Sequence, residues 1–283
     1  MTTKTVLVVG ATGLVGSAVV ETLVAEGQQV RAGTRDVSKH PATSGVVPVH
    51  LNVSEPGTFD AALDGVDAMF VLAPAGHADS FGFLAPFLDR ALGRVKKVVV
   101  MTASGVEHDD NIPLRRIELK IAASGVQHVI LRPSWFAQNF HTYWYQPIKQ
   151  AGVIPVPAAD AKTAFIDARD IGAAAARAIV SDAFNGKAFA LTGPEALGYA
   201  EAAAILSEAG DRTIRYTPID DATFAANLSG ALPPDYIGLL VALFGTVRQG
   251  FASHVDPSLR TLLGRAPRTL QDYARDHAAL FRA

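Results

Sequence analysis

The stretch LVVGATGLVGSAV, from Leu7 to Val19, decides the fold. Three glycines, Gly10, Gly13 and Gly16, stand three residues apart directly behind a run of apolar β-formers. In a turn that binds a dinucleotide, one glycine permits the tight turn, one lets the backbone approach the pyrophosphate, and one allows close packing of helix on strand. The phosphates then lie at the helix N-terminus, where free N–H groups favour negative charge. The stretch therefore predicts a dinucleotide-binding turn.

Apolar runs alternate with helical patterns through the first half of the chain. Most runs are continuously apolar, which suits parallel strands covered by helices on both faces. Strands are predicted at Thr5–Val9, Gln29–Thr34, Val46–Asn52, Asp67–Leu72, Lys97–Thr102 and Gln127–Leu131. Helices are predicted between them, at Leu14–Glu26, Phe59–Leu63, Ser80–Leu92 and Leu114–Ala123. This order predicts an α/β fold with a Rossmann-type, doubly wound parallel sheet.

The pattern changes after Arg132, where an aromatic and then proline-rich segment begins. A strand-like TAFID (163–167), an alanine-rich helix (Arg169–Val180), a strand in KAFALTG (187–193) and a helix at Tyr199–Glu208 follow. The last third reads as mostly helical. We expect a dinucleotide-binding Rossmann domain over residues 1–134. A smaller, mostly helical C-terminal lobe that interleaves with it and binds the substrate is expected over residues 135–283.

The composition narrows the classes of function. The 283 residues are 49% hydrophobic and carry a formal net charge of −2, without the clustered basic residues that nucleic acid requires. The chain has no cysteine, which excludes disulfides and a cysteine nucleophile and is consistent with a cytoplasmic protein. No apolar stretch is long enough to cross a membrane, and the eight histidines are scattered, so neither a membrane nor a metal site is predicted.

The sequence resembles a known family over nearly its whole length. VVGATGLVGSAVVETLVAEGQQVRAGTRD (8–36) is similar to the opening of the short-chain dehydrogenase/reductase superfamily, in its atypical NmrA-like branch. Further segments match that branch: LNVSEPGTFDAALDGVDAMFVLAP (51–74), IAASGVQHVILRPSWFAQNF (121–140) and FIDARDIGAAAARAI (165–179). The branch includes NAD(P)H-dependent quinone, azo-dye and triphenylmethane-dye reductases. It also includes redox-sensing regulators that bind the nucleotide but carry out no chemistry.

The residue after the second predicted strand indicates which nucleotide binds. NAD-specific folds place an acidic side chain there, on the ribose 2′-hydroxyl. Here the strand ends at Thr34 and Arg35 follows, whose guanidinium suits a 2′-phosphate by charge and by bidentate geometry. Lys39 could add a second positive charge, whereas Asp36 stands one position too late. The cofactor predicted is therefore NADP(H) rather than NAD(H).

The other cofactor contacts are expected at the carboxyl ends of the strands. The glycine loop also contributes Thr12, Leu14 and Val15. Similar proteins use the positions of Asn52 and Val53 near the adenine, and Leu72, Ala73 and Pro74 are expected under the nicotinamide ribose. The remaining expected contacts are Thr102, Lys120, Pro133 and Trp135.

The usual catalytic set of the superfamily is incomplete. That set is a Ser, a Tyr and a Lys, with the Tyr four residues before the Lys. Lys120 stands where the Lys is expected, but Arg116 replaces the Tyr, and Ser104 could replace the Ser. The missing phenol argues against ordinary reduction of ketones. Lys120 is expected to orient the nicotinamide ribose as a catalytic residue, the alternative being a surface lysine on an amphipathic helix.

The stretch RPSWFAQNFHTYWY (132–145) concentrates the aromatic residues. A flat aromatic wall suits a flat conjugated substrate, although core packing accounts for about half of such residues. The substrate contacts expected are Ser104, Trp135, Phe136, Phe140 and Tyr143. Tyr143 is also a candidate catalytic proton donor, with Tyr145 as the alternative.

Together these features predict an NADPH-dependent reductase that transfers hydride to a conjugated small molecule: a quinone, an azo or dye-like compound, an enone or an imine. The alternative is a non-catalytic NADP(H)-sensing regulator that docks a partner protein. The expected partner is a small substrate rather than nucleic acid or a membrane. The sequence leaves the oligomeric state open, a homodimer being one arrangement.

Overall fold

The computed structural model describes residues 3–39, 42–74 and 76–282, and their contacts divide the chain into two compact units. The first unit comprises Met1–Pro133, Ala168–Leu191 and Thr261–Gly264; the second comprises Ser134–Asp167, Thr192–Arg260 and Arg265–Ala283. The first boundary between the units, after Pro133, lies one residue before the domain boundary expected after residue 134. Ala168–Leu191 belong to the first unit because their helix and strand pack on its sheet.

The first unit is built on a seven-stranded sheet in the order β3-β2-β1-β4-β5-β6-β9. Every neighbouring pair is parallel. The strands are β1 (Thr5–Val9), β2 (Gln29–Thr34), β3 (Val46–His50), β4 (Ala68–Leu72), β5 (Lys97–Met101), β6 (Gln127–Pro133) and β9 (Lys187–Leu191). The predicted doubly wound α/β fold is confirmed, with the six predicted strands of the first half in place. The chain reverses its direction of growth between β1 and β4, which is where such sheets bind ligands.

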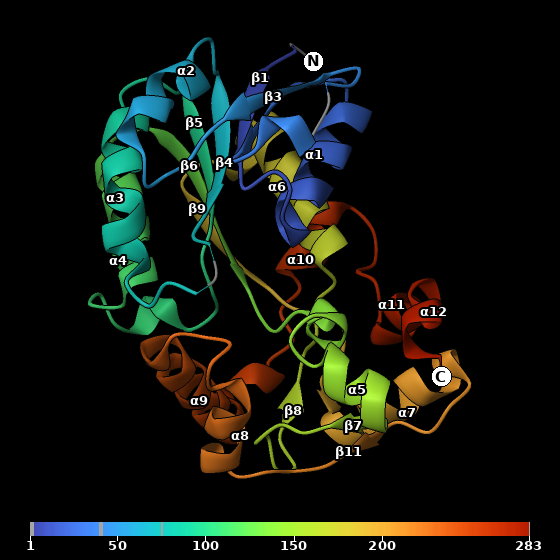
Figure 1. The fold of residues 1–283 in the computed structure, drawn as a ribbon. Coiled ribbons are helices and arrows are strands. Elements are labelled where there is room, and N and C mark those ends of the chain that lie inside the picture. Colours follow the sequence, from blue (N-terminus) through green and yellow to red (C-terminus); the bar gives the residue numbers. More distant parts are fainter. Residues whose placement is uncertain (1–2, 40–41, 75, 283) are drawn as a thin grey trace. The chain divides into compact units, whose positions relative to one another are not determined.

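Helices cover both faces of this sheet (Figure 1). One face carries α2 (Phe59–Leu63), α3 (Ser80–Ala91) and α4 (Pro113–Ala123), and the other carries α1 (Leu14–Ala25) and α6 (Ala168–Val180). Alternate strand residues such as Leu7 and Met69 are buried against the α3–α4 face. On the opposite face α1 and α6 pack at close range, since a β-carbon on Gly172 would lie 2.7 Å from the backbone carbonyl carbon of Ala18. Burial on both faces explains the continuously apolar strands.

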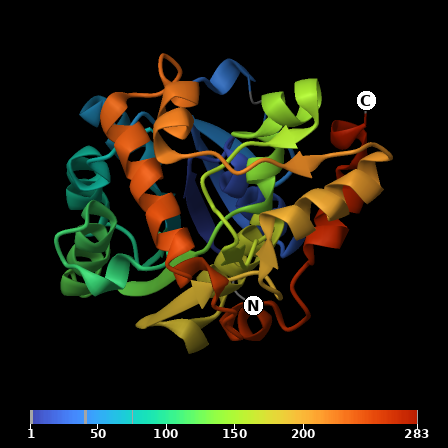
Figure 2. The same cartoon turned by 90° about the horizontal axis from the view of Figure 1, so that it is seen from below.

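The second unit is mostly helical, with two small sheets. Its longest helix is α9, the long orange helix of Figure 2. The helices are α5 (Tyr145–Ala151), α7 (Tyr199–Gly210), α8 (Asp221–Leu228), α9 (Pro234–Arg248), α11 (Leu270–Asp276) and α12 (Ala278–Phe281). The strands are β7 (Val153–Ile154) with β11 (Arg215–Tyr216), which pair in parallel, and β8 (Lys162–Thr163) with β10 (Leu197–Gly198), which pair antiparallel. Helix α10 (Ser258–Leu263) spans a boundary between the units.

Short 3₁₀ helices complete the described structure. They are η1 (Val37–Lys39), η2 (Pro56–Thr58), η3 (Val106–His108), η4 (Ala137–His141), η5 (Asp182–Phe184) and η6 (Phe251–Ser253). None of the helices in the described ranges is both long and apolar enough to cross a membrane.

The strand expected at residues 163–167 does not form as a regular strand. Only Thr163 belongs to β8, and the following backbone bonds to separate segments: Ala164 donates to the carbonyl of Ala252, and Ile166 donates to that of Trp135. Because successive residues bond to different partners, no continuous ladder can develop, although the apolar side chains of this segment are buried as in a strand.

Candidate functional site

The three glycines of the first loop have three different roles. Gly10 directly follows β1 with φ at +69°, in the left-handed region that favours glycine. Gly13 is the N-cap of α1, and its N–H donates to the Gly10 carbonyl at 2.9 Å. A β-carbon on Gly16 would overlap the carbonyl oxygen of Gly10 and lie 2.8 Å from its carbonyl carbon. Gly16 therefore allows α1 to pack directly on the end of β1.

The N-terminus of α1 is open to an anion. The N-cap Gly13 provides no side chain to bond the first N–H groups, and the first turn holds no acidic residue. Thr12, Gly13 and Leu14 are exposed, whereas Val15 and Gly16 are buried and present only backbone. Uncapped N–H groups at the positive end of a helix fit a pyrophosphate. The loop thus meets the requirements of a dinucleotide site on its own geometry.

Arg35 stands exposed directly after β2. No described residue forms a hydrogen bond or ion pair with its guanidinium. The neighbouring Asp36 carboxylate faces its own turn, where it accepts from the Ser38 N–H at 3.1 Å and from the Ser38 hydroxyl at 2.6 Å. Arg35 is therefore free to bind a phosphate, while Asp36 supports the local turn. The side chain of Lys39 lies outside the described part of the structure.

The ends of β3 and β4 carry the next predicted contacts. The Asn52 amide donates to Glu55 at 2.6 Å, and its oxygen accepts from the Ser54 N–H at 3.1 Å, so this side chain holds the loop after β3. Val53 is half-buried against the α3–α4 core. Leu72 ends β4 and Ala73 and Pro74 follow it; all three are partly exposed at the same edge of the sheet as the glycine loop.

A buried ionic network joins the ends of β5 and β6 to α4. Fully buried Glu118 accepts from the Thr102 hydroxyl at 2.6 Å and from Arg132 at 2.9 and 2.7 Å. Arg115 donates to its second oxygen at 2.9 Å. Burial raises the pKa of Glu118, but the bonds from Arg132, Thr102 and Arg115 outweigh it and hold that pKa below its ordinary value.

This network fixes Thr102 and the neighbouring strand ends. The Thr102 hydroxyl is turned toward α4 and its N–H donates to the Leu131 carbonyl at 2.9 Å, so neither donor of Thr102 remains for a cofactor. Ser104 donates its hydroxyl to the Arg132 carbonyl and its N–H to the Pro133 carbonyl, both at 3.0 Å. We did not predict Glu118 as a site residue. The available signal was a carboxylate beside Ile117, on the buried face of a helix that precedes a strand with an arginine, Arg132, near its end.

Lys120 is not at this edge of the sheet. It lies in the last turn of α4, seven residues after Pro113 and thus about 10 Å along the helix from its start. Its ammonium forms an ion pair with Asp89, near the end of α3. Both helices begin at the carboxyl edge and run back toward the amino edge. In this placement Lys120 pairs with Asp89, and its contact with the nicotinamide ribose stays a prediction.

An aromatic pocket opens within the second unit. The segment after β6 contributes Trp135, Asn139, Tyr143 and Trp144 to its wall. Helices α8 and α9 contribute Phe224, Leu228, Tyr236, Leu240 and Phe244. None of these residues is charged. The residues from α8 and α9 were not predicted, because no local pattern in the C-terminal third distinguishes them from ordinary helix-packing residues.

Two of the predicted substrate residues line this pocket. Trp135 lies against Phe244, with ring centroids 4.8 Å apart, and Tyr143 is 44% exposed at the rim. Burial, and then the neighbouring Tyr236 side chain, raise the pKa of Tyr143 well above its ordinary value. The Tyr143 phenol therefore stays neutral and keeps its proton at physiological pH.

The other two aromatic predictions lie elsewhere in the second unit. Phe140 is 0% exposed and packs edge-on against Trp144 at 5.1 Å, so it supports the pocket wall and has no surface for a substrate. Phe136 is partly exposed, forms a backbone bridge with Ile166 and is not among the residues lining the pocket. Within this one aromatic stretch, some side chains therefore line the pocket and others pack behind its lining residues, depending on the direction in which the backbone points them.

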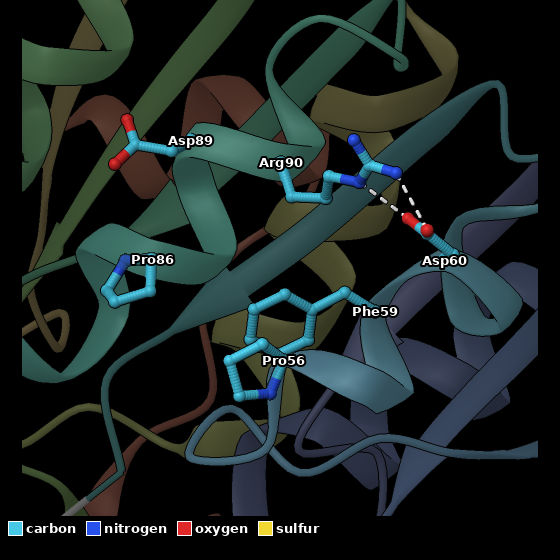
Figure 3. Close-up of a pocket in the computed structure, with 6 residues that line it drawn as sticks. All are labelled: Pro56, Phe59, Asp60, Pro86, Asp89 and Arg90. Atoms are coloured by element: carbon cyan, nitrogen blue, oxygen red, sulfur yellow. Dashed lines mark hydrogen bonds and ion pairs between the residues drawn. The ribbon is translucent and has the colours of Figure 1, made fainter.

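A second hollow, of about 390 Å³, lies on the first unit between α2 and α3 (Figure 3). Arg90 donates to both carboxylate oxygens of Asp60, at 2.5 and 2.7 Å, and Asp89 is paired with Lys120. Pro56, Phe59 and Pro86 supply its apolar surface. Its charges are neutralised within the protein, so we assign it no ligand.

Comparison with known proteins agrees with this geometry. A family model described as NAD(P)H-binding matches residues 10–181. An uncharacterized oxidoreductase of Bacillus subtilis is 33% identical over 97% of this chain and 95% of its own length. An NAD(P)H azoreductase of Xenophilus azovorans is 32% identical over 98% of this chain and 99% of its own length.

Solved structures show the same fold. The NADPH-dependent quinone oxidoreductase QOR2 of Escherichia coli, complexed with NADPH, superposes with a TM-score of 0.83 at 23% identity and covers 96% of this chain and 99% of its own. NmrA, a negative transcriptional regulator in complex with NADP, superposes with a TM-score of 0.78 at 18% identity and covers 99% and 97%. The resemblance and the nicotinamide cofactor predicted from the sequence are confirmed.

Proposed function

The chain belongs to the NAD(P)H-binding family, as an NmrA-like member, and on that premise we propose that it is an NADPH-dependent reductase of a flat, conjugated small molecule. The acceptor class is a quinone, an azo or dye-like compound, an enone or an imine. When bound, the reduced nicotinamide supplies the hydride. The protein supplies the binding, the orientation and the exclusion of water.

The first unit holds the nucleotide in this proposal. The uncapped N–H groups of α1 bind the pyrophosphate, and Gly13 keeps their approach clear of side chains. The unpaired Arg35 guanidinium binds the 2′-phosphate and sets the preference for NADPH over NADH. Leu72, Ala73 and Pro74 lie along the same edge of the sheet and contact the nicotinamide ribose.

The aromatic pocket of the second unit is the observation that carries the acceptor class. Its wall is aromatic and uncharged, which favours a flat apolar ring over a sugar, a phosphate or an amino acid. The activities named for the Xenophilus azovorans azoreductase and for QOR2 support the same class of acceptor. A conjugated acceptor takes the hydride without a strong acid, which agrees with Arg116 standing where the superfamily's Tyr is expected.

The test is NADPH oxidation under anaerobic conditions with a panel of acceptors: a naphthoquinone, an azo dye, an enone, a cyclic imine and a simple aliphatic ketone. We expect turnover with at least one conjugated acceptor and little with the aliphatic ketone. Arg94→Ala, which removes a surface arginine paired with Asp60, is the control variant and should keep the wild-type rate. Tight NADPH binding with no acceptor reduced would contradict the proposal and favour a nucleotide-sensing regulator.

A further inference from the structure

The turn after β2 places two opposite charges on consecutive residues. Arg35 follows β2 directly and is exposed, and Asp36 comes next, half-buried, before η1 begins at Val37. Charges on consecutive residues, whose Cα atoms lie about 3.8 Å apart, act within the Debye length of about 8–10 Å. An anion bound by Arg35 therefore meets a repulsive charge on the next residue, and the position of that carboxylate affects which nucleotide binds.

The Asp36 carboxylate is held by a residue of η1. Its Oδ1 atom accepts from the Ser38 N–H at 3.1 Å and from the Ser38 hydroxyl at 2.6 Å. The backbone of Asp36 is anchored as well, because its N–H donates to the buried Thr34 hydroxyl at 3.3 Å and its carbonyl accepts from that hydroxyl at 3.4 Å. The turn is thus fixed to the end of β2, and the carboxylate is directed toward η1.

The hydroxyl bond is the part of this restraint that depends on the side chain of residue 38. At 2.6 Å it has the short length of a charge-assisted O–H···O⁻ bond. The N–H bond would persist with another residue there, but the carboxylate would be held less firmly in the turn. A carboxylate after the second strand that reaches the ribose accepts from the 2′-hydroxyl, which is how NAD-specific folds select NADH.

We propose that Ser38 is a positioning residue for the choice of nucleotide: its hydroxyl keeps the Asp36 carboxylate in the turn and leaves the ribose 2′ position to Arg35. This inference rests on the proposed function, in which Arg35 binds the 2′-phosphate, and adds the reason why the adjacent carboxylate does not oppose that contact. Ser38 acts through Asp36 and does not itself touch the nucleotide.

Ser38→Ala removes the hydroxyl and keeps the N–H. The affinities of the wild type and the variant for NADPH and for NADH are measured by isothermal titration calorimetry, without any acceptor. We expect the ratio of NADPH affinity to NADH affinity to fall by about 3- to 10-fold, which is the size of one hydrogen bond. Ser38→Thr, which retains a hydroxyl, should keep the wild-type ratio.

The effect of Ser38 should disappear when the charge of Asp36 is removed. Asp36→Asn keeps the shape of the side chain and the oxygen that accepts from Ser38, so the turn can persist. Adding Ser38→Ala to Asp36→Asn should leave the ratio of affinities unchanged. If Ser38 instead bound the 2′-phosphate directly, Ser38→Ala would cause the same loss in both backgrounds, and this result would overturn the inference.

A second turn with the same bonds provides the control. Asp109 Oδ1 accepts from the Asn111 N–H and from the Asn111 side-chain amide, both at 2.9 Å. Asn111→Ala removes a side-chain bond of the same kind from a carboxylate that does not adjoin Arg35, and it should keep the wild-type ratio. An unchanged ratio in Ser38→Ala, an equal shift in Asn111→Ala, or equal losses of NADPH and NADH affinity in Ser38→Ala would each overturn the inference.

Acceptor turnover keeps the two proposals separate. A lowered ratio in Ser38→Ala that vanishes in the Asp36→Asn background, with no acceptor reduced by the wild type, would contradict the reductase and leave the role of Ser38 standing. Turnover of a conjugated acceptor, with an unchanged ratio in Ser38→Ala, would contradict the role of Ser38 alone.

Discussion

Glu118 and Arg132 form a two-bond ion pair inside the first unit, with Nε and one terminal nitrogen of Arg132 at 2.9 and 2.7 Å from the two carboxylate oxygens. The Glu118 side chain is fully buried, and that of Arg132 nearly so. Since Thr102 and Arg115 bond to the same carboxylate, this pair fixes the end of β5 and the end of β6 against α4. The strand ends at which the nucleotide is proposed to bind therefore depend on one buried charge.

Glu118→Gln should destabilise the protein strongly. Gln keeps the shape but removes the charge, which leaves the nearly buried Arg132 with only the more distant Glu107 carboxylate at 3.7 Å, and breaking such a buried pair costs about 3–5 kcal/mol. Urea unfolding followed by circular dichroism measures the change. Asp110→Asn, which breaks an exposed ion pair with Arg115, is the matched control and should cost less than about 1 kcal/mol. Equal losses in the two variants would show that Glu118 contributes no more than a surface charge.

The same pair predicts an acid-sensitive fold. The pKa of Glu118 is lower in the folded chain than its ordinary value, so its contribution to stability is present above the ordinary pKa. That contribution is lost as the pH falls through the lowered pKa, from about pH 5 downward. Urea midpoints of the wild type should therefore fall with acidification in this range, and those of Glu118→Gln should fall less. Parallel curves for the two proteins would assign the acid sensitivity to other carboxyl groups.

Arg35→Ala should remove the preference for NADPH. Losing a charge-assisted bond to a phosphate costs about 1.5–3 kcal/mol, which corresponds to a loss of roughly 10- to 150-fold in NADPH affinity. NADH affinity should stay the same, because NADH has no 2′-phosphate. Titration by nucleotide fluorescence measures both constants, with Arg94→Ala as the control. A preference retained in Arg35→Ala would place the 2′-phosphate contact elsewhere.

Substitutions of two glycines in the first loop should affect different properties: one should lower the stability of the fold, and the other should lower the affinity for the nucleotide. Gly16→Ala forces a β-carbon into the Gly10 carbonyl, so we expect a loss of at least about 1–3 kcal/mol and a lower Tm. At Gly13 a β-carbon meets only the Gly10 oxygen at 3.3 Å and the backbone is extended, so Gly13→Ala should keep stability within about 1 kcal/mol. Its nucleotide affinity should nevertheless fall, because the methyl group stands at the uncapped helix end. Unchanged affinity in Gly13→Ala would remove this loop from the binding site.

Local patterns were sufficient for most of the first unit. Three glycines at fixed spacing and continuous apolar runs predicted β1, α1 and the parallel sheet, because each signal lies within one element and its neighbour. The pairing of β9 with β6 could not be predicted from local sequence patterns, because nearly sixty residues separate Pro133 from Leu191, which face each other in register. The two-residue β8 was overestimated because a buried irregular segment is as apolar as a strand.

The roles of individual side chains in the candidate site could not be predicted from the sequence, because they depend on how distant elements pack against one another. Lys120 matched the expected position in the chain, but the helix carries it to Asp89. Phe140 and Trp135 are five residues apart in one aromatic stretch, yet the first is core and the second is pocket wall. Tyr236 and Tyr143 line the same pocket only because α9 returns to the segment after β6, which no periodicity within either element can indicate.

The central claim is hydride delivery to a conjugated acceptor, and a single-turnover experiment tests it most directly. Protein loaded with NADPH is mixed anaerobically with a naphthoquinone, and the nucleotide absorbance is followed with and without deuterium at both hydrogens of nicotinamide C4. The account predicts loss of NADPH in step with formation of an equal amount of quinol, and a slower reaction with the deuterated cofactor. Bound NADPH that survives mixing with the quinone and with every other conjugated acceptor of the panel would contradict it.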